Sequence, residues 1–173
     1  MLSEYIEVGE VLKPQGIGGL VKVRPDTETP ERFLELSDVY IRRDAAFEPA
    51  SVSDVSVRDG FVFLRLNGAA TRNEAEKQRG WVLSVERSRA RNLPEGEWFV
   101  CDLIGCRVIG DRGTEIGTMR DVLLGGPNPV MVIGTAKGNL LVAMMKFVLG
   151  KVDPEAGLVV LREDRLPEVA VYE

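Results

Sequence analysis

Apolar and polar residues alternate over short stretches along the first half of the chain, and turn-forming residues separate these stretches. The alternation predicts strands at residues 5–12, 20–24, 39–42, 52–57, 61–66 and 81–85. A capping box of Thr71 and Glu74 predicts one helix over residues 72–79 that stops at Gly80, and residues 30–34 can hold one helical turn. Because no long helix separates the strands, we expect a small antiparallel barrel rather than a doubly wound α/β sheet.

The second half of the chain shows the same pattern of short apolar runs. Strands are predicted near residues 98–101, 105–109, 116–124, 130–133, 140–142 and 158–162, with turns at 110–113, 125–129, 137–139 and 153–157; in the first half, a turn is predicted at 13–19. Ile116, Met119 and Val122 break the period of two, which predicts a β-bulge. The polar tail, residues 163–173, is expected to be loosely held. The fold class is therefore all-β with one short helix, in two domains, residues 1–88 and 97–173, joined by a linker at 89–96.

Composition limits the classes of function. The 173 residues are 45% apolar and carry a net charge of −5, and neither half has a basic excess. A protein that binds mainly by neutralising phosphates would show such an excess, so a protein partner is expected to supply much of any binding near nucleic acid. No apolar run approaches the roughly 20 residues of a membrane span, and the first residues lack the features of a signal peptide. We therefore expect a cytoplasmic protein with no membrane contact.

The chain has no histidine and two cysteines, Cys101 and Cys106. On an extended chain these two side chains would point to opposite faces about 16 Å apart, whereas a disulfide needs Cα atoms within about 7 Å. Reduced thiols are therefore expected. The lack of histidine argues against a metal site and removes the commonest general base, so we expect neither metal, cofactor nor enzyme activity.

Two glycine-rich segments and three arginines permit more than one interpretation. Residues 15–19 and 125–129 are predicted to be tight turns, because a phosphate-binding loop would be followed by a helix and here a strand follows. Arg87, Arg89 and Arg91 occupy alternate positions of the linker, where they are either solvated or in contact with RNA phosphates.

The neighbouring aromatics Trp98 and Phe99 are the main candidates for a contact site. On a strand they would face opposite ways. Either one ring fills the core and the other packs between domains, or the pair anchors a partner protein, since aromatic side chains dominate interface hot spots. Our prediction is that Trp98 faces the partner and Phe99 packs inward.

Several groups of residues, in order and spacing, carry a resemblance to a known family. They are residues 8–23, 26–33, 66–68, 74–76, 79–80, 97–99, 102–108, 117, 128–130, 148, 152–153 and 157. With these, the chain resembles the ribosome maturation factor RimM family over nearly its whole length. It differs from the usual family pattern at Gln15 (commonly His), Gly18 (commonly basic), Ala143 (commonly Pro) and in the aromatic pair, which is often two tyrosines.

The resemblance implies an N-terminal six-stranded barrel like that of translation factors and a C-terminal PRC barrel. It implies a monomeric, non-enzymatic assembly factor that binds the small ribosomal subunit through ribosomal protein S-nineteen, and assists folding and processing of the 16S rRNA 3′ domain, with rRNA contact being indirect. The expected partner-binding residues are Trp98, Phe99 and Asp102. Residues expected to contact RNA or the subunit are Lys13, Gln15, Arg87, Arg89 and Arg91. The alternatives are a direct rRNA-binding module and a PRC-barrel adaptor unrelated to ribosomes.

Overall fold

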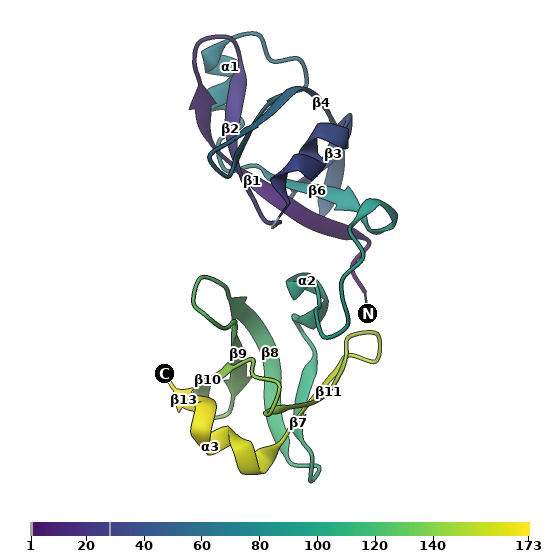
Figure 1. The fold of residues 1–173 in the computed structure, drawn as a ribbon, viewed down its shortest axis with the longest axis vertical. Helices are drawn as coiled ribbons and strands as arrows, with labels where there is room; N and C mark the ends of the chain where they lie inside the picture. The colour runs from purple at the N-terminus through teal and green to yellow at the C-terminus, as the bar shows by residue number, and fades with distance from the viewer. Residues whose placement is uncertain (1, 28) are drawn as a thin grey trace. The chain divides into compact units, whose positions relative to one another are not determined.

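The computed structural model describes residues 2–27 and 29–173, which form two compact units (Figure 1). The N-terminal unit is Glu4–Arg91, and the C-terminal unit contains Asn92–Glu173 together with Leu2 and Ser3. Glu28, part of the segment 26–33 that carries the family resemblance, lies outside the described residues, as does Met1. No helix in the described ranges is long and apolar enough to cross a membrane.

The N-terminal unit is a closed barrel of six antiparallel strands, in the order β1-β2-β5-β4-β3-β6. Its strands are β1 (Tyr5–Gln15), β2 (Leu20–Pro25), β3 (Asp38–Arg43), β4 (Ala46–Arg58), β5 (Phe61–Leu66) and β6 (Val82–Glu86). Its helical segments are η1 (Pro30–Glu35), α1 (Arg72–Glu76) and η2 (Arg87–Arg89). The predicted small antiparallel barrel is confirmed.

Alternation along the strands builds the barrel core. In β2, for example, Val21 and Val23 are fully buried while Lys22 between them is not. The capping box that begins α1 is present: the Thr71 hydroxyl accepts a hydrogen bond from the Glu74 N–H at 3.2 Å. The helix ends at Glu76, earlier than predicted, and a turn then leads to Gly80, whose φ is +81°. Strand β1 also runs three residues into the predicted turn and ends at Gln15.

The C-terminal unit contains one seven-stranded sheet in the order β11-β12-β7-β8-β9-β10-β13, in which only β7 and β12 pair in parallel among the described strands. Its strands are β7 (Arg107–Gly110), β8 (Glu115–Leu123), β9 (Val130–Thr135), β10 (Gly138–Ala143), β11 (Leu149–Asp153), β12 (Leu158–Leu161) and β13 (Ala170–Tyr172). Its helical segments are α2 (Val100–Leu103), η3 (Glu163–Arg165) and α3 (Leu166–Val169). The predicted bulge in β8 is confirmed by a register shift between Met119 and Asp121.

Three predictions for this unit are wrong. Residues 98–101 are not a strand, because the backbone turns into α2 at Val100. Strand β11 was missed because a register shift between Leu149 and Val152 hides its period of two. The tail is not loosely held: Leu166 and Val169 pack against the core, and β13 pairs with β10.

Candidate partner-binding site

The aromatic pair lies just before α2 in the C-terminal unit. Trp98 and Phe99 are both half-buried, and Phe99 precedes the first helical residue, Val100. Trp98 packs against the hydrophobic core of this unit. Because the segment is not a strand, the two rings need not face opposite ways. Trp98 packs inward, although only Phe99 was expected to do so.

Further exposed apolar side chains lie on or next to α2 and β8, the elements beside this segment. Ile104 follows α2. Leu123 is the last residue of β8, the strand that α2 contacts, and Leu124 comes directly after it. Figure 1 shows α2 and the loop after β8 at the same end of the C-terminal unit. We call Trp98, Phe99, Ile104, Leu123 and Leu124 the α2 surface. The sequence analysis missed the last three, although the run Leu123-Leu124 directly before Gly125 could have indicated an exposed apolar turn.

Asp102 has a different role from the predicted partner contact. Its side chain is only 6% exposed, and one carboxylate oxygen accepts a hydrogen bond from the Ser3 backbone N–H at 3.0 Å. This bond ties the start of the chain to α2. A buried carboxylate held in this way positions the helix and offers little surface to a partner.

Both cysteines keep their thiols, but not for the geometric reason predicted. Cys101 is in α2, so no extended chain joins it to Cys106. The Cys106 thiol is buried and donates to the Asp102 backbone carbonyl at 3.3 Å. Burial raises the pKa of this thiol, and the Asp102 charge adds to the effect. A protonated, buried thiol is a poor nucleophile, so Cys106 has a packing role.

The three linker arginines do not form an extended, alternating stripe. Residues 87–89 form the short helical segment η2. The Arg89 guanidinium donates to both carboxylate oxygens of Asp38 at 3.2 Å, so its charge is largely balanced within the N-terminal unit. Arg87 and Arg91 lie two positions before and after Arg89 in the sequence, and the Arg87 backbone N–H donates to the Glu4 carbonyl. The structure thus brings Arg89 to a carboxylate rather than leaving it available for phosphate.

Lys13 and Gln15 lie at the end of β1, beside the connection to β2. Lys13 is exposed and follows a register shift in the pairing of β1 with β2, whereas Gln15 is half-buried opposite Leu20. Lys13 and Gln15 are therefore distant in sequence from Arg87 and Arg89, the arginines of η2. No group of three or more His, Cys, Asp or Glu side chains suited to a metal ion occurs in residues 2–27 and 29–173.

Glu7 on β1 gives the N-terminal unit a dependence on pH. Partial burial, followed by the neighbouring Asp26 carboxyl group, raises the pKa of Glu7 from 4.5 to about 7. The folded state therefore binds a proton that the unfolded state has lost between pH 4.5 and 7, so this contribution to stability decreases as the pH rises through that window.

We expect Glu7→Gln to weaken this pH dependence, because the amide stays neutral. In urea unfolding, the free energy of unfolding of the wild type should fall between pH 5 and pH 8 by more than that of Glu7→Gln does. Glu31→Gln, a change at an exposed carboxylate of η1, serves as the control. Identical pH profiles for wild type and Glu7→Gln would contradict the assignment.

Together these features define an all-β protein of two units whose candidate site is a contact surface built on aromatic and aliphatic side chains. Comparison with known proteins identifies the family. Residues 6–90 match the sequence model described as the RimM N-terminal domain. The chain is 37% identical over 165 residues to the ribosome maturation factor RimM of Caldanaerobacter subterraneus, covering 93% of this chain and 97% of that protein. The chain therefore belongs to the RimM family, which confirms the resemblance.

Other relatives carry the same name. The ribosome maturation factor RimM of Thermoanaerobacter pseudethanolicus is 37% identical over 161 residues, covering 92% of this chain and 96% of that protein. That of Clostridium botulinum is 34% identical over 161 residues, covering 93% and 95%. Among solved structures, a 16S ribosomal RNA processing protein RimM from Pseudomonas aeruginosa is 24% identical with a TM-score of 0.46, covering 91% of this chain and 96% of that one.

Proposed function

We propose that this protein is a non-enzymatic assembly factor for the small ribosomal subunit. The observation that supports the proposal most strongly is the full-length similarity to proteins named ribosome maturation factor RimM, at 37% identity over 93% of the chain. On this proposal the protein acts in the cytoplasm as a monomer. It stabilises the subunit head while the 3′ domain of 16S rRNA folds and is processed.

The proposed partner within the subunit is ribosomal protein S-nineteen, and the proposed contact is the α2 surface. Aromatic and aliphatic side chains at one end of a unit are suited to a protein interface, because aromatic side chains bury a large area at a low cost in conformational entropy. The net charge of −5 complements a basic ribosomal protein. Opposite net charges also accelerate the encounter at low salt.

A direct comparison of two ligands tests this proposal against the alternative of an rRNA-binding module. In titrations, isolated S-nineteen protein should bind the chain saturably, whereas naked 16S rRNA should bind weakly and with a shallow dependence on salt, since few phosphates are neutralised. Tight, steeply salt-dependent binding to naked rRNA together with no binding to S-nineteen would favour the alternative.

A further inference from the structure

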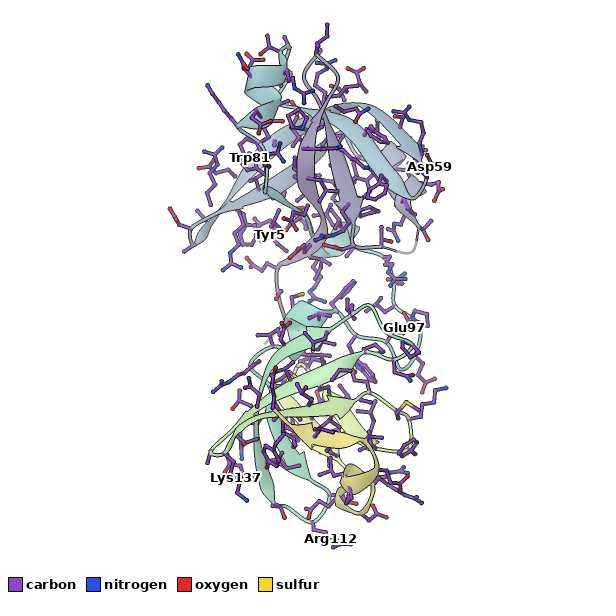
Figure 2. The ribbon with its side chains drawn as sticks, turned by 90° about the vertical axis from the view of Figure 1, so that its left-hand side faces the viewer. Tyr5, Asp59, Trp81, Glu97, Arg112 and Lys137 are labelled. Atoms are coloured by element: carbon purple, nitrogen blue, oxygen red, sulfur yellow. The ribbon has the colours of Figure 1, made fainter. Side chains whose placement is uncertain are left out.

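A pocket in the N-terminal unit lies between the turn from β3 to β4, the connection from β5 to α1, and α1 with the turn that follows it. Its volume is about 780 Å³, within the range of roughly 300–1,000 Å³ that ligand-binding pockets have. Its walls include Asn67, Gln78 and Trp81. Figure 2 shows Trp81 on the side of this unit where α1 lies.

Contacts with the rest of the barrel hold the pocket walls in place. The Asn67 side-chain carbonyl accepts a hydrogen bond from the Ser51 backbone N–H at 3.1 Å. The Trp81 backbone carbonyl accepts one from the Val11 N–H at 2.9 Å. The Arg43 guanidinium lies over the Trp81 ring, 4.8 Å from its centroid, and so joins two of the walls. Because the walls are held in this way, binding would cost the protein little conformational entropy.

Two side chains of opposite charge line the pocket without forming an ion pair. Other charged groups of the lining are already engaged: Arg43 pairs with Glu48 at 3.3 Å, and the Glu74 carboxylate accepts hydrogen bonds from backbone N–H groups just before α1. Among the described residues, by contrast, no ion pair within 4 Å involves Asp44 or Lys77. The pocket therefore offers one carboxylate and one ammonium group to a ligand.

The balance of charge distinguishes between kinds of ligand. The two cations of the lining, Arg43 and Lys77, are matched by two carboxylates, Asp44 and Glu74. A site for phosphate or nucleic acid would show a cationic excess. This lining is instead suited to a ligand that has little net charge and carries groups of both signs.

One buried acceptor in the pocket wall lacks a donor. Gln78 is only 5% exposed, and its Nε2 donates to the Leu66 carbonyl at 3.2 Å. Its Oε1 has no hydrogen-bond partner among the described residues. Because an unpartnered buried acceptor is unfavourable, a ligand N–H that reached Gln78 would be favoured. A peptide backbone carries such an N–H at every residue except proline.

We propose that this pocket binds an extended segment of a partner protein, in which an apolar side chain lies between a basic and an acidic one. The apolar side chain packs against Trp81 and Ala69. The basic side chain pairs with Asp44 and the acidic one with Lys77, while a backbone N–H supplies the donor that Gln78 lacks. This is a second protein-binding site, in a different unit from the α2 surface, and it does not depend on the proposed function.

The two tryptophans of the chain, Trp81 and Trp98, allow a direct test by NMR. In full-length protein with isotope-labelled tryptophan, each indole N–H gives one signal, and Trp81→Phe assigns the two signals. The probes are acetyl-Lys-Leu-Glu-amide and acetyl-Glu-Leu-Lys-amide, which present the two charges in either order. At least one should shift the Trp81 signal saturably and leave the Trp98 signal unchanged. No saturable shift of Trp81 with either peptide, or equal shifts of both tryptophans, would overturn the proposal.

Charge reversal at Lys77 separates recognition of the ligand from a structural effect. Lys77→Glu should weaken binding of the active peptide by about fivefold or more, because it replaces an exposed ion pair by a repulsion, and acetyl-Lys-Leu-Lys-amide should restore it. Lys13→Glu, at an exposed lysine outside the pocket, should leave both affinities unchanged. The same peptide preference in Lys77→Glu as in the wild type would contradict the proposal. So would a shift of Trp81 caused by single-stranded hexauridylate but by neither peptide.

Discussion

Replacing Gly19 by alanine is expected to lower the free energy of unfolding of the N-terminal unit by about 3 kcal/mol or more. Two effects combine. An alanine at φ +88° adopts a left-handed conformation that costs roughly 1–2 kcal/mol. In addition, its Cβ would overlap the backbone carbonyl of Ala69. That carbonyl cannot move freely, because it belongs to the segment that Arg65 joins to the hairpin.

Gly60 provides the matched control for this variant. It has a similar φ of +78° in the turn between β4 and β5, but a Cβ atom added there would meet nothing within 4 Å. Gly60→Ala should therefore show only the conformational cost, roughly 1–2 kcal/mol. Amide hydrogen exchange in β1 and β2 measures the stability of this unit separately. Equal losses in the two variants would show that the contact with Ala69 contributes nothing.

Replacing Trp98 by alanine is expected to weaken binding to isolated S-nineteen by about 30-fold or more, which corresponds to a hot spot of about 2 kcal/mol. Trp98 also packs against the core, so the loss could include a less stable C-terminal unit. Leu124→Asp resolves this ambiguity, because Leu124 is 70% exposed and its replacement should leave the core intact. We expect this variant to weaken binding as well, without changing the unfolding transition.

Tyr172→Ala is the control for the α2 surface. Tyr172 is an exposed aromatic residue of β13 in the same unit, outside the proposed surface. The Tyr172→Ala variant should bind S-nineteen with wild-type affinity in the same titration. If Trp98→Ala and Leu124→Asp both bind with wild-type affinity, the α2 surface is not the contact.

The barrel could be predicted from the sequence because the patterns that indicate its strands and its helix involve residues close together in the chain. Alternation in strands such as β2 and the capping box at Thr71 depend on residues a few positions apart, and both are present in the structure. The α2 segment could not be predicted in this way. Four helical residues are too short to show a period of 3.6, and the apolar run around Trp98 and Phe99 is equally compatible with a strand.

The arrangement of the candidate sites depends on long-range contacts that no local pattern contains. Arg65 and Arg79 reach carbonyls of the β1–β2 hairpin 47 and 67 positions earlier in the chain. Asp102 binds the Ser3 N–H across 99 positions, which explains why a residue predicted to contact a partner is buried. Side-chain chemistry alone suggested candidate residues, but only the fold shows which of them remain exposed.

The most direct test of the central claim is co-sedimentation of the protein with small ribosomal subunits. Immature subunits that still carry unprocessed 16S rRNA and mature subunits would be compared at equal concentration and salt. The protein is expected to sediment with immature subunits and to be largely absent from mature ones. Its absence from both kinds of subunit, or equal amounts on both, would contradict a role in small-subunit maturation.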